Sequence, residues 1–190
     1  MSTPYIDINL KKIANFLRKK SGLSVLFLRR DISQNILSIE LPSREVTEPI
    51  KELLGSSFTK LIYDGETIPY NFFDLESGII EAYFPNALET GAYLFKDSPS
   101  ITTIVFDKLE QLSAPTAFQD SSLKNLIIKS NTLCVIPSAF VADRLFALKE
   151  LKVYVPSELL DTYKSATNWT VYKDRIFPIS DYYQEEEENK

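Results

Sequence analysis

The stretch Ile101-Thr-Thr-Ile104-Val-Phe106 carries a spacing of apolar residues that returns along the chain about every 22 residues. The last two apolar residues are two apart, so they point to the same side of a strand, and the first lies where the chain bends into it. A short strand repeated in this way cannot bury its apolar face alone, so the sequence predicts a solenoid with one parallel sheet. The six copies are Ile36/Ile39/Leu41, Phe58/Leu61/Tyr63, Ile79/Ala82/Phe84, Ile101/Ile104/Phe106, Leu123/Leu126/Ile128 and Leu148/Leu151/Val153.

The same spacing predicts which residues stack on one another. The central apolar residues of the copies should form one inward ladder: Ile39, Leu61, Ala82, Ile104, Leu126 and Leu151. A phenylalanine follows four of the copies as a second marker: Phe73, Phe95, Phe118 and Phe140.

Between the last two apolar positions lies one residue that should face outward. In order these residues are Glu40, Ile62, Tyr83, Val105, Ile127 and Lys152, and they are flanked by a polar ladder of Ser38, Lys60, Glu81, Thr103, Asn125 and Glu150. The apolar members Ile62, Tyr83, Val105 and Ile127 beside a polar stripe form the pattern expected of an interface. Two alternatives stay open, because β-propensity alone favours such residues in strands and a loop of the same chain could cover them.

Charge is distributed unevenly along the 190 residues, although the net charge is only −5. Residues 9–20 are predicted to form a helix with an apolar stripe of Leu10, Ile13 and Leu17. The positive charge of this region is interpreted either as a solvated helix face or as a contact with an acidic partner. The basic residues proposed for that contact are Lys11, Lys12, Arg18, Lys19 and Lys20. The acidic balance of the whole chain argues against general nucleic-acid binding.

Residue types that carry chemistry are sparse. The chain has no histidine, a single cysteine and five scattered glycines, so a histidine-based catalytic site, a zinc cluster and a phosphate-binding loop have no basis. Cys134 is expected to be a small core residue. We therefore expect no enzyme activity, no cofactor and no metal site. A signal peptide and an apolar run of membrane-spanning length are also not evident, which predicts synthesis in the cytoplasm and no membrane span.

Four segments follow from these patterns: residues 1–35 as a basic helix and strand for attachment or capping, 36–155 as the repeats, 156–180 as a C-terminal cap and 181–190 as a disordered acidic tail. Within the first, residues 24–28 have the composition of a strand. In the third, Pro156 can begin a last helix whose apolar face covers the open end of the stack. The residues expected to make this cap are Pro156, Leu160, Tyr163 and Trp169.

The closing segment of the chain resembles a known family. Leu148-Lys-Glu-Leu-Lys-Val-Tyr-Val-Pro156, Leu160-Asp-Thr-Tyr-Lys-Ser-Ala-Thr-Asn-Trp169 and Ile176-Phe-Pro-Ile179 are similar to the end of BspA-type leucine-rich-repeat proteins. Upstream, Pro115-Thr-Ala-Phe118 and Pro137-Ser-Ala-Phe140 resemble the Ala-Phe marker of that family. The resemblance implies an α/β fold: a short leucine-rich-repeat solenoid with a parallel β-sheet, an N-terminal helix and a C-terminal helical cap.

Members of this family include secreted surface proteins and structural proteins of bacteriophages, and the resemblance is greater to the phage members. It implies a virion structural protein of the tail, baseplate or fibre, made in the host cytoplasm and acting as a protein–protein interaction or host-adsorption module. The implied partners are other virion proteins in an oligomeric assembly and the host cell surface. The alternatives are a capsid-decoration or head-fibre protein and a non-virion binding module inside the bacterial cell.

Overall fold

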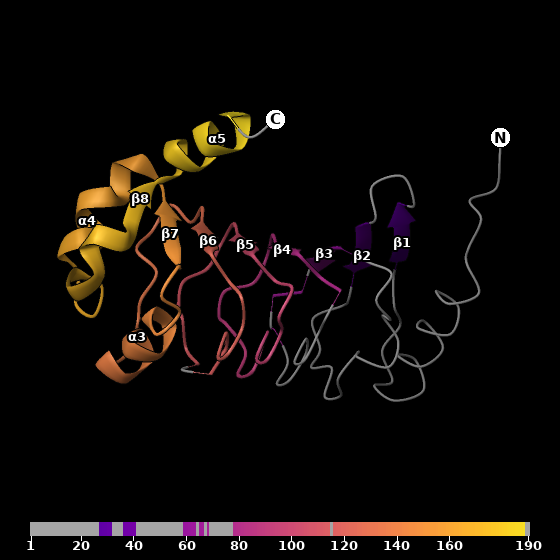
Figure 1. The fold of residues 1–190 in the computed structure, drawn as a ribbon, viewed down its shortest axis with the longest axis horizontal. Coiled ribbons are helices and arrows are strands. Elements are labelled where there is room, and N and C mark those ends of the chain that lie inside the picture. Colours follow the sequence, from indigo (N-terminus) through magenta and orange to yellow (C-terminus); the bar gives the residue numbers. More distant parts are fainter. Residues whose placement is uncertain are drawn as a thin grey trace.

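Eight short strands lie side by side in the order in which they occur along the chain (Figure 1). The computed structural model describes residues 59–63, 65–66, 68, 78–114 and 116–188, together with the backbone of residues 27–31 and 36–40. The strands are β1 (Phe27–Asp31), β2 (Ile36–Glu40), β3 (Lys60–Tyr63), β4 (Glu81–Phe84), β5 (Thr103–Phe106), β6 (Asn125–Ile128), β7 (Lys152–Val155) and β8 (Ile176–Pro178). The predicted helix over residues 9–20 lies outside the described residues.

Parallel pairing joins each strand from β2 to β8 to the next one along the chain, whereas β1 pairs with β2 in the antiparallel sense. The backbone enters successive strands through the same hydrogen bond. The Thr102 amide donates to the Ile80 carbonyl at 2.8 Å, and the Lys124 amide donates to the Thr102 carbonyl at 2.9 Å. The chain is therefore an α/β protein in which neighbouring strands are also neighbours in sequence.

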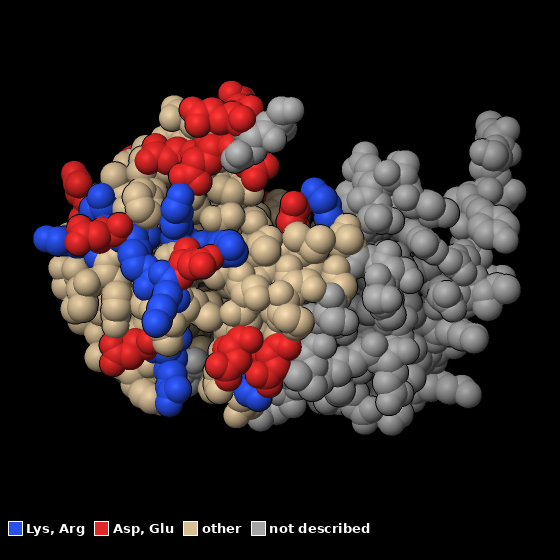
Figure 2. Space-filling model, viewed as in Figure 1, with Lys and Arg blue, Asp and Glu red and all other residues tan. Residues whose placement is uncertain are grey.

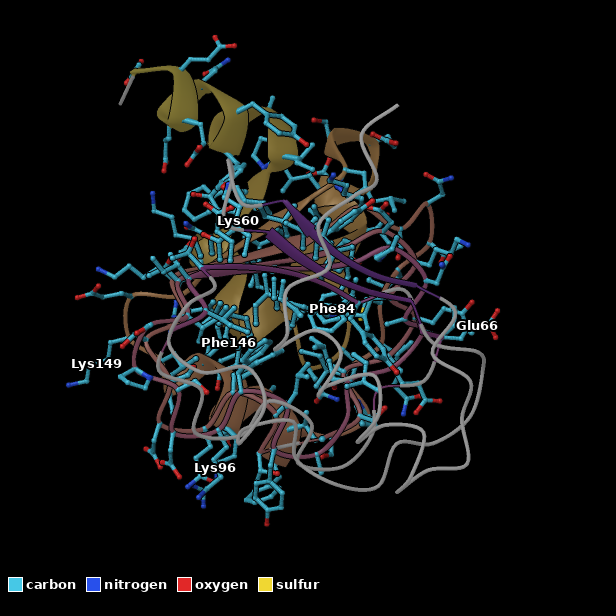
Figure 3. The ribbon with its side chains drawn as sticks, turned by 90° about the vertical axis from the view of Figure 1, so that its right-hand side faces the viewer. Lys60, Glu66, Phe84, Lys96, Phe146 and Lys149 are labelled. Carbon is cyan, nitrogen blue, oxygen red and sulfur yellow. The ribbon has the colours of Figure 1, made fainter. Side chains whose placement is uncertain are left out.

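Apolar side chains fill the space between the sheet and the segments that return from one strand to the next. Phe84 lies at the centre of this core, stacked on Phe106 with ring centroids 4.9 Å apart and tilted against Tyr63 at 5.9 Å. Phe95 and Phe118 face the sheet from the return segments and are buried. Figure 3 shows the two sides of the sheet, with Phe84 on the core side and Lys60 on the outer side.

The inward ladder differs from the prediction at both of its ends. Leu61, Ala82, Ile104 and Leu126 lie opposite one another as expected, but Leu37 rather than Ile39 pairs with Leu61, and Val153 rather than Leu151 pairs with Leu126. Both errors are shifts of two residues, which the period-two alternation of a strand does not distinguish. At the C-terminal end the cause is an enlarged connection, because Leu126 and Val153 are 27 residues apart whereas Ile104 and Leu126 are 22 apart.

Helix α3 (Ala139–Phe146) occupies this enlarged connection. The Ser138 hydroxyl caps it by accepting a hydrogen bond from the Val141 amide at 3.3 Å. The second marker is not equivalent in all copies: Phe95 and Phe118 are buried, whereas Phe140 is 57% exposed on α3, where Val141, Leu145 and Phe146 are buried instead. The helical period moves the inward positions to these later residues.

Helical segments close the end of the row beyond β7 (Figure 1). They are the 3₁₀ helix η2 (Ser157–Leu159), α4 (Leu160–Ser165) and the 3₁₀ helix η3 (Thr170–Arg175), whereas α5 (Ile179–Glu188) follows β8 and runs back above the strands. The prediction of a disordered tail over residues 181–190 is corrected here, because all but its last two residues belong to α5. Tyr182, which packs on Tyr154 of β7, is the apolar contact that the acidic composition concealed.

Candidate protein-binding surface

The outward apolar ladder is longer than the sequence pattern indicates. Its register runs through Ile62, Tyr83, Val105, Ile127, Tyr154 and Phe177 on strands β3 to β8. Tyr154 takes the place predicted for Lys152, which lies instead in the flanking polar ladder opposite Asn125. The cause is the same two-residue shift in β7 that moved Val153 into the inward ladder.

Exposure divides this ladder into two halves. Ile62, Tyr83 and Val105 are partly exposed, whereas Ile127 is 1% exposed and Tyr154 is fully buried although both face away from the core. The interface predicted from Ile62, Tyr83, Val105 and Ile127 therefore loses Ile127 as an accessible member. The alternative that the chain covers its own stripe holds at β7, where the cover over Tyr154 is a helix rather than a loop.

Helix α5 is held on this half of the ladder by one aromatic residue and one acid. The Tyr182 ring packs edge-on against the Tyr154 ring at 5.2 Å. Glu185 accepts a hydrogen bond from the Tyr154 hydroxyl at 3.2 Å and pairs with the Lys152 ammonium at 2.8 Å. The hydrogen bond from Lys152 lowers the pKa of Glu185, and the same bond raises the pKa of Lys152. No residue of α5 is fully buried, so this is a surface contact.

A shallow groove remains beside α5 on the open half of the ladder. Its floor is Ile62, Tyr83 and Val105, and its sides are formed by Lys60, Glu81, Thr103 and Tyr182. Burial, followed by the charges of Glu186 and Glu81, raises the pKa of Tyr182 to about 12, so its hydroxyl stays neutral. Figure 2 shows the acidic residues of α5 gathered at the top of the molecule, above the sheet.

Polar contacts hold the floor of the groove in place. The Tyr83 hydroxyl donates to the Asp107 carboxylate, and the Lys129 ammonium lies 3.7 Å from the same carboxylate and 5.6 Å from the centre of the Tyr83 ring. The Lys60 ammonium pairs with the Glu81 carboxylate at 2.6 Å along one side. Each of these exposed pairs contributes little stability, about 0–1 kcal/mol, so they mainly orient side chains.

Sequence reasoning missed Asp107 and Lys129. Both come directly after the last apolar residue of their copies, Phe106 and Ile128. An alignment of the copies at that position would have shown an acidic residue, Asp107, followed in the next copy by a basic residue, Lys129. Tyr182 carried no repeat signal at all, because it lies outside the copies.

The other predicted site residues lie elsewhere. Lys11, Lys12, Arg18, Lys19 and Lys20 fall outside the described residues. Pro156 is buried and Leu160 is partly buried at the C-terminal end of the row. Tyr163 and Trp169 are fully buried there, and both bond the same backbone unit: the Cys134 amide donates to the Tyr163 hydroxyl at 2.9 Å, and the Trp169 indole donates to the Cys134 carbonyl at 2.8 Å.

No group of three or more histidine, cysteine, aspartate or glutamate residues in the described part of the chain is arranged so that it could hold a metal ion. Cys134 is buried, and burial raises the pKa of its thiol. The same described residues contain no helix with the length and apolar character to cross a membrane.

Comparison of the chain with protein-family models, curated proteins and solved structures finds no match.

Proposed function

We propose that the chain is a leucine-rich-repeat solenoid whose outer sheet face binds another protein through the groove floored by Ile62, Tyr83 and Val105. The observation that carries this proposal is that the same ladder already receives a helix. Helix α5 packs on its half at β7, through Tyr154, while the half at β3 to β5 keeps equivalent apolar residues open. Aromatic and aliphatic side chains framed by polar groups are typical of the centre of a protein interface.

The solenoid part of the proposal is supported by the repetition of backbone contacts on the side opposite the sheet. The Phe95 amide donates to the Ala117 carbonyl at 2.7 Å, and the Asp97 amide donates to the Gln119 carbonyl at 2.9 Å. Isolated parallel bridges join Glu89 to Gln111 and Gln111 to Val135. Each return segment thus contacts the next, as expected where every repeat packs only on its neighbours.

The setting follows from the resemblance of the closing segment to phage members of the BspA-type family. On that ground we propose a virion structural protein of the tail, baseplate or fibre, with other virion proteins as partners. A capsid position and a non-virion binding role remain the alternatives. A mass-spectrometric inventory of purified particles separates the virion roles from the non-virion one, because a virion component is present at a fixed copy number and a host-cell binding module is not recovered.

The binding face is tested by photo-crosslinking from within the assembled particle. A photoreactive amino acid at Ile62, on the floor of the groove, is expected to capture a second protein. The matched control carries the same amino acid at Val171, which is 77% exposed and lies on η3, outside the strands that form the groove. Capture from Val171 but not from Ile62 contradicts the proposal.

A further inference from the structure

We propose that the groove binds residues 9–20 of a second copy of this chain, so that copies associate head to tail. This inference rests on the proposed function, because it names the partner of the same outer face. Two features of the groove select the occupant: the spacing of its apolar floor and the acidic helix beside it.

The apolar floor matches the predicted helix in length. Ile62, Tyr83 and Val105 span two strand spacings, which is about 10 Å. Leu10, Ile13 and Leu17 lie on one face of the predicted helix, and the seven residue steps from Leu10 to Leu17 rise about 10 Å. A helix laid across β3, β4 and β5 therefore places one apolar side chain above each member of the floor.

The negative charge beside the groove favours a cationic partner. The last turns of α5 carry Glu185, Glu186, Glu187 and Glu188, and no basic residue lies in the last turn. Negative charge at the C-terminal end of a helix opposes the helix dipole, and neighbouring acids repel one another. Within the described part of the chain, Glu185 has Lys152 as a salt-bridge partner, but no salt bridge reaches Glu186, Glu187 or Glu188. Basic residues placed there would relieve this repulsion.

With Leu17 above Val105, the end of the segment that carries Arg18, Lys19 and Lys20 points toward α5. The helix α5 runs from β8 back above the row of strands, so its acidic end lies toward the groove (Figure 1). Opposite charges thus meet at the same end of the contact, which favours one orientation of the bound segment.

A second copy fits this arrangement better than the same chain does. Lys20 precedes the start of β1 at Phe27 by seven residues, which reach roughly 24 Å when fully extended. With Leu17 above Val105, Lys20 lies about one strand spacing beyond β5, and from β1 to β6 there are five strand spacings, or about 24 Å. The linker of the same molecule would have to be fully extended to reach this position, whereas a second molecule carries no such constraint. A contact between opposite ends of two copies is heterologous and extends into rings or filaments.

The test uses charge reversal in the full chain, read by sedimentation velocity at low salt. The wild type is expected to associate in a concentration-dependent way, and more weakly at about 1 M salt, where screening shortens to about 3 Å. Two variants, Lys19→Glu/Lys20→Glu and Glu187→Lys/Glu188→Lys, are each expected to associate at least tenfold more weakly. Their equimolar mixture is expected to associate again, and so is a chain carrying all four changes.

The outcomes separate this inference from the function on which it rests. A wild type that stays monomeric at every concentration overturns head-to-tail association, and if Ile62 still captures another virion protein, the binding face itself stands. If each variant alone associates more weakly and their mixture does not regain association, the segment docks within its own chain, and this result also overturns the inference. A further variant, Val105→Arg, leaves these charges in place and is expected to weaken association by removing the apolar floor; normal association of that variant contradicts the role of the groove.

Discussion

Removal of the Trp169 side chain is the strongest test of the C-terminal closure. The indole is fully buried, with its ring edge-on to Tyr163 at 5.1 Å and to Phe146 at 6.1 Å. Its N–H donates to the Cys134 carbonyl at 2.8 Å. One side chain thus joins α3, α4 and the last return segment, so its loss should be felt by the whole closure.

Two losses add up in Trp169→Ala. Truncation of a fully buried tryptophan costs about 3–5 kcal/mol, and this cost includes the cavity that is left. The Cys134 carbonyl also loses its donor, which costs up to about 1–3 kcal/mol where water does not enter. In a chain of this size each kcal/mol corresponds to about 2–4 °C in melting temperature, so Trp169→Ala should melt at least roughly 6 °C lower. Trp169→Phe keeps most of the apolar surface and should lose about 1–3 kcal/mol.

Urea unfolding followed by circular dichroism measures both variants against a matched control. Val171→Ala removes an exposed side chain two residues away and is expected to change stability by less than about 0.5 kcal/mol. If Trp169→Ala unfolds within about 1 kcal/mol of the wild type, or if it costs no more than Val171→Ala, the segment after β7 does not close the core and the reasoning is refuted. Should Trp169→Ala fail to fold, Trp169→Phe carries the comparison.

Three further predictions follow from single contacts. Ile104→Asp places an unpaired charge in the inward ladder and should prevent folding, whereas Val105→Asp on the other face should still give a cooperative thermal transition. Similar melting of the two variants contradicts the alternation of inward and outward residues along β5. The difference between the alkaline absorbance titrations at 295 nm of the wild type and Tyr182→Phe should show one tyrosine with a pKa of about 12, and the stability that its burial contributes is present below pH 10 and lost as the pH rises from about 10 toward 12. A difference curve with its midpoint near pH 10 contradicts the contact of α5 with the sheet. The Arg175 guanidinium donates to the carbonyls of Phe146 at 2.9 Å and Leu151 at 2.8 Å and to that of Leu148, so Arg175→Lys should lower the free energy of chemical unfolding by about 1.5–3 kcal/mol. An unchanged free energy of unfolding refutes this role of the planar guanidinium.

The repeat predicted the parallel sheet and the register of its middle strands because the copies there have nearly the same length. From Leu61 through Leu126 the paired residues are 21, 22 and 22 apart, so the pattern of apolar residues and the pairing of the backbone agree. In the last copy the pattern aligns Leu151 with Leu126, but the backbone aligns Val153. A period-two alternation is satisfied by either choice, so the apolar pattern alone does not distinguish a shift of two residues. The length of the preceding connection, which contains α3, is what distinguishes them.

Helix α5 could not be predicted from composition, because its stability depends on contacts made far away in sequence. Four consecutive glutamates indicate a solvated segment when they are taken alone. Tyr182 and Glu185 acquire their partners, Tyr154 and Lys152, only after β7 has joined the sheet. The outward ladder was predicted because periodicity identifies which side chains face away from the core. The ladder of accessible residues was predicted too long because periodicity does not say which of these side chains the rest of the chain covers.

Both faces of a parallel sheet are usually covered, because its strands carry apolar residues on both sides. Here the return segments cover the inner face along the described strands, while the outer face is treated differently at its two ends. At β7 the apolar residue Tyr154 is covered by α5, and at β3 to β5 the equivalent Ile62, Tyr83 and Val105 remain open. Strand propensity alone does not require neighbouring groups to hold these side chains in place. The Tyr83 hydroxyl nevertheless donates to the Asp107 carboxylate, and the Tyr83 ring lies under the Lys129 ammonium. Under the function proposed above, this ordered apolar floor lowers the entropic cost of binding a second helix, and the packing of Tyr182 on Tyr154 is the precedent within the chain for such a contact.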